Sequence, residues 1–262
     1  MDPAIAQYAL AAASGVLVGF TLGLVGGGGS ILALPLLVHV VGVGNPHVAI
    51  GTSALAVAAN ALAGLAGHAR NHNVNWRCGG AFAAAGVVGA AIGSTLGKAV
   101  DGQKLLFLFA LLMLVVAALM FRSRGREGVE NVQCNRDNLP RVLTFGIGTG
   151  TLSGFFGIGG GFLILPALIA STSMPIYRAV GTSLVVVSAL GLTTAINYAL
   201  SGLLDWPLAA SFIAGGVAGS IAGTTTSRRI SANKGKLNAV FAAIVVVVAI
   251  YMIYKSWLAF AG

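Results

Sequence analysis

The stretch that decides the fold is GLVGGGGSILALP, residues 23–35, in which four consecutive glycines lie inside an apolar run. Glycine is the poorest helix former after proline, so this run predicts an interrupted helix. Within a bilayer, irregular backbone is tolerated only where protein or an aqueous cavity surrounds it. The stretch therefore predicts a break that is either buried for structural reasons or lines a site.

The composition of the chain is that of a polytopic membrane protein. Of its 262 residues, 57% are hydrophobic and 8% are charged, whereas a soluble domain has about 25% charged residues. Several apolar segments reach the roughly 20 residues that span a bilayer. The apolar segments are 4–25, 31–44, 48–67, 78–97, 105–121, 142–156, 162–173, 179–200, 207–227 and 237–258.

The net charge of +9 does not indicate nucleic-acid binding, because Lys and Arg lie in short loops between apolar segments, where the positive-inside rule places them. The first basic residue is Arg70, so the N-terminus lacks the pattern of a cleavable signal peptide. Cys78 and Cys134 are too few for a disulfide framework or a metal site. No metal and no cofactor are expected, since His68 and His72 lie in a polar loop.

Three stretches of the first half recur in the same order in the second half, which predicts an internal duplication. The pairs are GLVGGGGSILALP (23–35) with GFFGIGGGFLILP (154–166), AIGTSALAV (49–57) with AVGTSLVVV (179–187), and NWRCGGAFAAAGVVGAAIG (75–93) with DWPLAASFIAGGVAGSIAG (205–223). The predicted repeats are residues 1–122 and 141–262, joined by a polar linker at 123–140.

The basic residues indicate how the two repeats are oriented. If each repeat has three full spans and a Gly-broken hairpin that returns to its own side, the repeats are inverted. That arrangement places 12 of the 15 Lys and Arg residues on the linker side, and only Lys98, Lys104 and Lys255 on the other. A parallel arrangement divides them 7 and 8. We therefore expect an all-α protein of inverted repeats with about eight to ten membrane segments, a cytoplasmic linker and both termini outside.

The returning arms of the two hairpins, 31–44 and 162–173, are too short to cross a ~30 Å hydrocarbon core at ~1.5 Å per residue. The hairpin tips are therefore expected inside the membrane, one from each face, as in many secondary transporters. At such a tip, free backbone N–H groups and a helix N-terminus form an anion site. Ser30 can cap the first of these helices or donate its hydroxyl. The predicted substrate-binding tip residues are Gly26, Gly27, Gly28, Gly29, Ser30, Gly157, Gly159, Gly160 and Gly161.

Close helix packing is the alternative explanation for glycines in apolar segments. It is the preferred explanation for the regularly spaced glycines of the third aligned pair, which are Gly86, Gly89, Gly93, Gly216, Gly219 and Gly223. For the two clusters the functional explanation is preferred, because four adjacent glycines exceed what packing requires.

Hydroxyl groups of the two GTS sequences form a second set of predicted substrate contacts, which are Thr52, Ser53, Thr182 and Ser183. They can donate to an anion or bond to a carbonyl of their own helix. Arg178 and His47 precede these sequences and can attract or gate an anion; the alternatives are a topology determinant and a solvated side chain. Asn60 lies within a span and can face a substrate pathway. No carboxylate lies within a span, which argues against a proton relay through an intramembrane acid and against a cation as the substrate.

The duplicated order of a Gly-rich turn, a proline and GTS resembles the sulfite exporter TauE/SafE family of membrane permeases, over residues 8–258. The first copy, VGGGGS, departs slightly from the fuller GIGGG of the second. The resemblance implies a secondary transporter of sulfite, sulfoacetate or other organosulfonates in the bacterial plasma (inner) membrane, working by alternating access.

The expected partners are a small anionic substrate and membrane lipid, without nucleic acid. The coupling ion (H+ or Na+) and a homodimer are left open. An anion channel of the same fold is the alternative function. An enzyme is not expected, because no nucleophile–base pair or metal cluster is recognisable.

Overall fold

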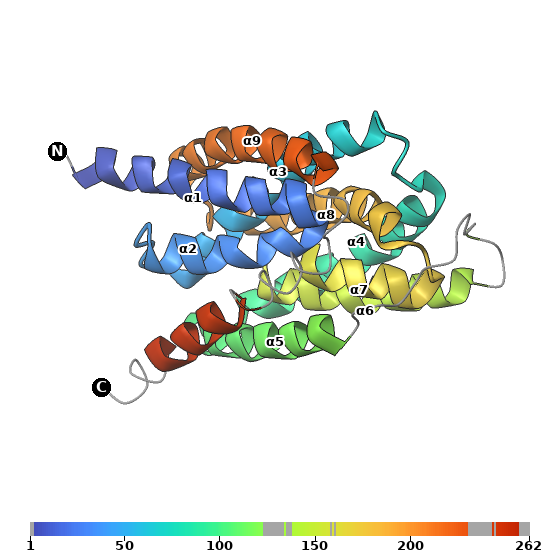
Figure 1. The fold of residues 1–262 in the computed structure, drawn as a ribbon. Coiled ribbons are helices and arrows are strands. Elements are labelled where there is room, and N and C mark those ends of the chain that lie inside the picture. Colours follow the sequence, from blue (N-terminus) through green and yellow to red (C-terminus); the bar gives the residue numbers. More distant parts are fainter. Residues whose placement is uncertain are drawn as a thin grey trace.

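The computed structural model describes residues 3–122, 134, 138–157, 159, 161–229, 243 and 245–256. The described chain is an elongated bundle of helices without strands (Figure 1). Its elements are α1 (Pro3–Val25), the 3-10 helix η1 (Gly26–Leu32), α2 (Ala33–His39), α3 (Pro46–Ala69), α4 (Trp76–Lys98), α5 (Gly102–Arg122), α6 (Leu139–Phe156), α7 (Gly161–Thr172), α8 (Ile176–Ala199), α9 (Trp206–Arg229) and an apolar helix at Val245–Ser256.

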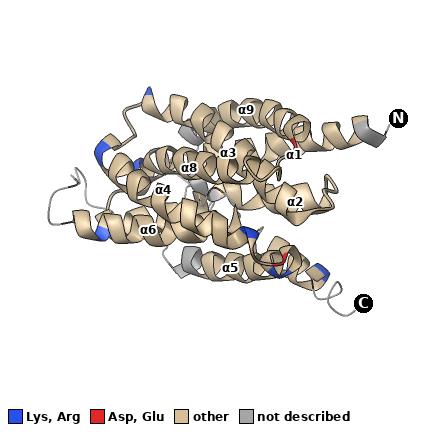
Figure 2. Cartoon of the chain, turned by 180° about the vertical axis from the view of Figure 1, so that it is seen from behind, with Lys and Arg blue, Asp and Glu red and all other residues tan. Residues whose placement is uncertain are grey.

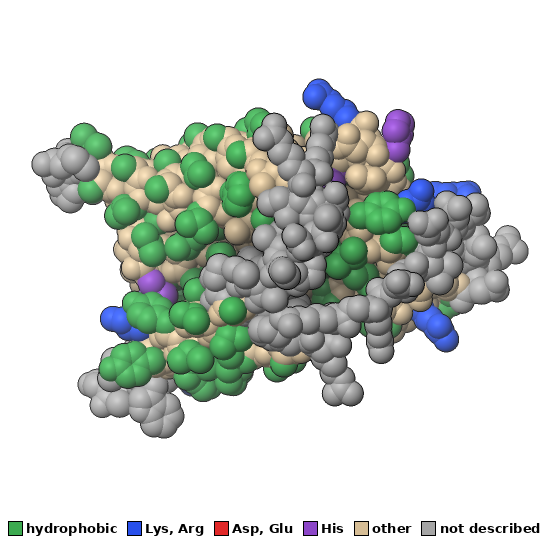
Figure 3. Space-filling model, in the orientation of Figure 1, with side chains coloured by type: hydrophobic (Ala, Val, Ile, Leu, Met, Phe, Trp, Pro, Cys, Tyr) green, Lys and Arg blue, Asp and Glu red, His purple; other side chains and the backbone are tan. Residues whose placement is uncertain are grey.

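Five of these helices, α1, α3, α4, α8 and α9, are long and apolar enough to cross a membrane. Figure 2 shows that the charged residues of the described chain lie toward the two ends of the bundle. Hydrophobic side chains cover much of the flank between those ends (Figure 3). This distribution matches a bilayer that surrounds the flank and leaves both ends in water. The chain is thus a multi-pass membrane protein, as its composition predicts.

The two ends of the bundle carry different residues and are named here by them. At the linker end, α3 ends and α4, α6 and α8 begin, while at the Lys98 end α3 begins and α4 and α8 end. The predicted linker, 123–140, lies outside the described residues except for Cys134 and residues 138–140. The described side chains at the start of α4, α6 and α8 include Arg77, Arg141 and Arg178.

The first helix of each half packs along the third long helix of the other half, α1 on α9 and α6 on α4. Within each pair the two helices are parallel. In the α1–α9 pair, for example, Gly15 lies against Phe212, and Gly23 lies against Ser220. The backbones touch, because a Cβ added to Gly19 would lie 1.9 Å from the carbonyl oxygen of Gly216. Such contact requires glycine, and it explains the small-residue stripes of these helices.

The packing explanation for the regularly spaced glycines is confirmed. Four of them face a backbone carbonyl oxygen of the neighbouring helix, at distances from an added Cβ of 2.0 to 2.4 Å. These are Gly89, Gly93, Gly219 and Gly223. Gly86 faces the Leu190 side chain at 2.8 Å, and Gly216 faces the Asn60 amide at 1.9 Å.

The two GTS helices, α3 and α8, pack against each other in opposite directions at the centre of the bundle. Gly51, near the start of α3, lies against Leu203, which follows α8, whereas Gly191 farther back in α8 lies against Ala54 and Ala58. These two helices, which correspond in the sequence alignment of the halves, are therefore antiparallel.

The first half contains a hairpin. After α1 the chain turns back through η1, and α2 lies beside α1 (Figure 1). The Gln7 Nε2 atom, near the start of α1, donates to the carbonyl oxygen of Val41, just after α2, at 3.3 Å. The two arms of the hairpin therefore begin and end at the same end of the bundle. The returning helices α2 and α7 have 7 and 12 residues and are short, as expected.

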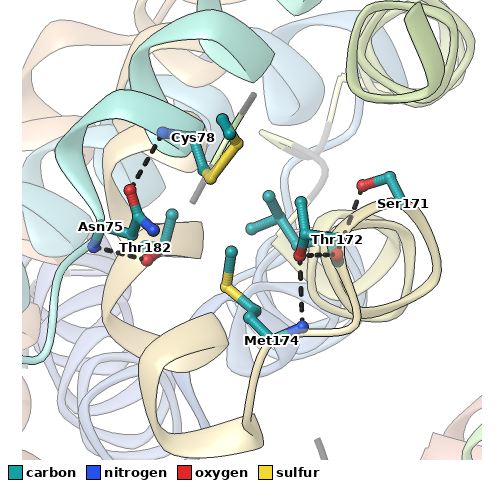
Figure 4. The surroundings of a disulfide bond; sticks show 8 residues. Asn75, Cys78, Ser171, Thr172, Met174 and Thr182 are labelled. Atoms are coloured by element: carbon teal, nitrogen blue, oxygen red, sulfur yellow. Dashed lines mark hydrogen bonds between the residues drawn. A yellow bond between two sulfur atoms is a disulfide. The ribbon is translucent and has the colours of Figure 1, made fainter. Parts of the chain in front are cut away.

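The two cysteines form a disulfide bond between Cys78 and Cys134, with their Cα atoms 5.4 Å apart. Two cysteines are too few for a disulfide framework, and this single bond was not anticipated from the sequence. Folding brings Cys134 of the linker to the first turn of α4, beside Thr172 and Met174 at the end of α7 (Figure 4). The bond ties the linker to the linker end of the bundle.

Candidate functional site

The two Gly-rich segments meet at the centre of the bundle. The 3-10 helix η1, which contains the first glycine cluster, packs against α7, which begins at the second cluster, and against α8. Helix α7 in turn packs against α6 and α8, and Gly159, two residues before α7, lies near Val57 of α3. The fold thus brings together the aligned stretches that begin at Gly23 and at Gly154, which are 131 residues apart in the sequence. We call this contact the tip pair.

The second tip is a true helix break. Gly157 ends α6 in the left-handed conformation, with φ +67, and Gly159 has φ +64. Other residues rarely adopt this conformation, and a Cβ on Gly157 would also lie 1.8 Å from the Ile50 side chain. Gly159 lies near Val57 and Gly191, in the middle parts of α3 and α8. The tip is therefore deep in the bundle. Ile158 and Gly160 lie outside the described residues.

The first tip differs from the second. Instead of breaking, the chain tightens into a 3-10 helix of 7 residues, which is longer than the usual run of about three to four. The α-helix that follows starts only at Ala33, and its N-cap is Leu32 without a side-chain hydrogen bond. Ser30 is fully buried inside η1. The hypothesis that Ser30 caps the returning helix is therefore wrong.

The positions of the other tip residues follow from these two elements. Gly29 lies in η1, where an added Cβ would be 2.3 Å from the Leu22 backbone nitrogen, so the turn packs tightly on α1. Gly161 is the first residue of α7. Gly26, Gly27 and Gly28 belong to η1, and their surroundings lie outside what the structure describes.

The threonines of the two GTS sequences each bind a loop of the opposite half. The Asp205 backbone N–H donates to Thr52 Oγ1 at 3.1 Å, and the Asn75 backbone N–H donates to Thr182 Oγ1 at 2.9 Å. The neighbouring glycine allows the approach, because an added Cβ on Gly51 would lie 2.2 Å from the Leu203 carbonyl oxygen. The GTS threonines thus link the two halves by hydrogen bonds. Each threonine hydroxyl acts as the acceptor in its bond, so its own proton is still available for donation.

The serines of the GTS sequences bond mainly within their own helices, which was the alternative expected for them. Ser53 Oγ donates to the Ile50 carbonyl oxygen at 2.9 Å, and Ser183 Oγ donates to that of Val180 at 2.8 Å. Ser53 also reaches the carbonyl oxygen of Gly157 at 3.5 Å. Ser53 therefore contacts the second tip.

The three remaining candidates lie away from the tips. Arg178 is half-buried in the first turn of α8 at the linker end, and His47 is half-buried in the first turn of α3 at the Lys98 end. Asn60 is fully buried, but its amide lies against Gly216 of α9.

Sequence reasoning missed a polar group at the Lys98 end. The Lys98 ammonium donates to the Asn197 carbonyl oxygen at 3.2 Å, to the Asn197 side-chain oxygen and to Ser201 Oγ at 2.7 Å. Its Nζ atom also lies 5.9 Å from the centroid of the Tyr198 ring. The sequence did contain a signal for this group, because Lys98 is one of only three basic residues expected on the side opposite the linker.

Five apolar spans around two glycine-rich interruptions that contact each other define a multi-pass membrane protein. Residues 11–252 match the family described as "Sulfite exporter TauE/SafE", and the chain belongs to this family. The resemblance drawn from the duplicated motifs is confirmed. The chain is therefore a membrane transporter.

Relatives from several organisms carry transporter names. A "Probable membrane transporter protein" of Xylella fastidiosa (strain 9a5c) is 54% identical over 245 residues, covering 93% of this chain and 94% of the relative. The "Probable membrane transporter protein YdhB" of Bacillus subtilis is 32% identical over 216 residues, covering 79% and 85%. A relative of the same description in Methanocaldococcus jannaschii is 30% identical over 195 residues, covering 70% of each chain. Proteins so named are generally not enzymes. No solved structure matches the chain significantly.

Proposed function

We propose that the protein is a secondary transporter of small sulfur-containing oxyanions, such as sulfite, sulfoacetate or other organosulfonates, and that it works by alternating access around the tip pair. The observation that carries the proposal is the contact between η1 and α7 in the centre of the bundle, beside α8 and α3. Irregular backbone at that depth is tolerated in a membrane only inside protein or at a cavity. The family description names sulfite.

The substrate would be held by the second tip and the residues around it. Gly159 and Gly161 leave backbone N–H groups at the start of α7, where the helix dipole favours an anion. Ser53 lies within reach of this tip. Gly160 of the same tip, and Gly26, Gly27, Gly28, Gly29 and Ser30 of the facing segment, are proposed to complete the site.

The proposal includes inverted repeats in the plasma membrane. Antiparallel packing of α3 and α8 supports it, because corresponding spans of inverted repeats must run in opposite directions. The parallel packing of α1 on α9 and of α6 on α4 agrees with the same arrangement. The excess of basic residues on the linker side supports a cytoplasmic linker with both termini outside.

Sulfite flux through purified protein in proteoliposomes tests the proposal. Gly159→Ala forces a Cβ into a left-handed residue at the tip, and Gly202→Ala does the same at φ +69 in a loop with open space around it. We expect Gly159→Ala to lower the initial flux roughly tenfold, because displaced donors bind the anion less well. Gly202→Ala is expected to keep the wild-type flux. Equal flux in both variants would show that the second tip is not the site.

The same assay separates a transporter from an anion channel. A transporter saturates with rising sulfite concentration, whereas a channel passes the anion electrically and faster. Absence of any flux of sulfite, sulfoacetate or related sulfonates through the wild-type protein would contradict the proposed substrate class.

A further inference from the structure

Three helices bring a lysine, a histidine and a tyrosine together at the Lys98 end of the bundle. Lys98 ends α4, His47 lies in the first turn of α3, and Tyr198 lies in the last turn of α8. The Lys98 Nζ atom and the His47 ring centroid lie 5.9 Å and 6.4 Å from the centroid of the Tyr198 ring. The tyrosine is thus close to both basic groups.

Several polar atoms of this cluster are buried without a hydrogen-bond partner. Tyr198 and Thr194 are 0% exposed, and within the described chain neither the tyrosine hydroxyl nor Thr194 Oγ1 has a partner. The His47 Nδ1 atom is likewise buried without a hydrogen-bond partner in the described chain. Buried polar side-chain atoms are nearly always bonded, so each exception needs an explanation. The residue before Thr194 shows how a threonine in a helix usually satisfies its hydroxyl: Thr193 Oγ1 donates to the Ala189 carbonyl oxygen at 2.8 Å.

The unpartnered hydroxyls lead toward the second tip. Tyr198, Thr194 and Gly191 are spaced by four and three residues in α8, and such residues share one helix face. Gly191 ends this row beside Gly159, the Cα atom of Gly191 being 3.6 Å from a Cβ added at Gly159. Two unpartnered hydroxyls therefore lie on the face of α8 that leads from the Lys98 end of the bundle toward Gly159.

The charge of the cluster is positive. All three hydrogen-bond acceptors of the Lys98 ammonium are neutral oxygens, from Asn197 and Ser201. Two carboxylates at this end are engaged elsewhere: Asp101 accepts from backbone N–H groups in the first turn of α5, and Asp205 accepts from the Leu208 N–H in α9. The lysine charge thus has no carboxylate partner in the described part of the chain.

We propose that His47, Lys98, Tyr198 and Thr194 form a second anion site, the Lys98-end site, through which a small oxyanion reaches Gly159. The tyrosine and threonine hydroxyls donate to the anion, the imidazole offers an N–H, and the ammonium supplies the attracting charge. The missing partner of each buried hydroxyl is then the transported anion itself. Passage to the tip rests on the proposed transport function, whereas binding at the Lys98-end site does not.

Binding is tested on purified full-length protein by the rise in unfolding temperature with added sulfite, and separately with sulfoacetate. The background is Gly159→Ala, which weakens the proposed tip site, so that the remaining response reports the Lys98-end site. Tyr198→Phe and Thr194→Val each remove one hydroxyl with little change of shape. We expect each to raise the half-saturating anion concentration about tenfold, through loss of one hydrogen bond to a charged group.

The matched controls are Tyr254→Phe, whose side chain is exposed, and Thr193→Val, whose hydroxyl already bonds its own helix. Both should keep the half-saturating concentration of the background protein. Equal values in all four variants would overturn the Lys98-end site. Lys98→Met gives a second test, since it should weaken binding and also remove much of its salt dependence.

Flux measurements separate this inference from the transport function. Tyr198→Phe in the otherwise wild-type chain should raise the KM for sulfite while leaving the maximal rate nearly unchanged. Anion-dependent stabilisation without flux would refute transport and retain the Lys98-end site. Flux with an unchanged KM in Tyr198→Phe and Thr194→Val would refute the site and retain transport. Neither stabilisation nor flux in the wild-type protein would refute both.

Discussion

Two glycines of α6 that are only two residues apart, Gly148 and Gly150, show why residue type alone does not reveal a glycine's role. Gly150 faces the Gly86 carbonyl oxygen, which would lie 2.2 Å from an added Cβ, whereas Gly148 has nothing within 4 Å. We expect Gly150→Ala to destabilise the protein by about 1–3 kcal/mol, because α4 and α6 must move apart. Gly148→Ala should be neutral, or stabilising by up to about 1 kcal/mol. Thermal unfolding in detergent checks both, and equal stability would mean that the two helices are not in backbone contact.

The residues that sequence reasoning could identify are those whose chemistry is local. A left-handed Gly157 and the close-packed Gly89 follow from glycine's lack of a side chain and from helical spacing. By contrast, nothing in the sequence distinguishes Thr194 from Thr193. One hydroxyl finds a carbonyl of its own helix and the other does not, and that difference depends on rotamer and on neighbours from other helices.

At the scale of elements, the disulfide bond makes a definite prediction. It joins cysteines separated by 56 positions and closes a loop that contains α4 and α5. Replacing Cys78 and Cys134 by serine should lower the free energy of unfolding by about 2–4 kcal/mol, mainly because the unfolded chain is then less constrained. Thermal unfolding with and without reductant measures this loss. Free thiols at both cysteines in the unreduced native protein would contradict the bond.

The glycine clusters and the GTS sequences show the limit of prediction for elements. Duplication correctly indicates that both halves contain an interruption, but it also suggests that the two interruptions are alike. In the structure the second is a left-handed break and the first is a 3-10 helix, because VGGGGS and GIGGG place their glycines differently. The hydrogen bond between Thr52 and the backbone at Asp205 joins opposite halves of the chain. No local sequence pattern can reveal such a contact.

For the whole molecule, the distribution of charge and the packing of α3 on α8 support one topology from independent directions. Basic residues are counted along the sequence, whereas the antiparallel contact between Gly191 and Ala54 or Ala58 arises from the fold. Both are consistent with halves of opposite orientation. A count of basic residues can bear on topology because a membrane allows each span only two directions.

The compartment faced by the linker end is where two physical arguments conflict. The excess of Lys and Arg assigns that end to the cytoplasm, but disulfide bonds are rare in reducing compartments, and Cys78–Cys134 lies there. Single cysteines at Ser173 and Ser201, in a Cys78→Ser, Cys134→Ser background, decide between them. Both serines are exposed, and they lie at opposite ends of α8.

We expect the charge argument to prevail, because 12 of 15 basic residues act together, whereas a single disulfide can be opened by cytoplasmic thiols. A membrane-impermeant maleimide added to intact cells should then label Ser201→Cys alone, and Ser173→Cys only after permeabilisation. The serine variant without added cysteine controls for background labelling. The reverse pattern would place the linker in an oxidising compartment, where the bond to Cys134 persists and permanently holds the linker against α4, and it would reverse the side from which an anion reaches the Lys98-end site.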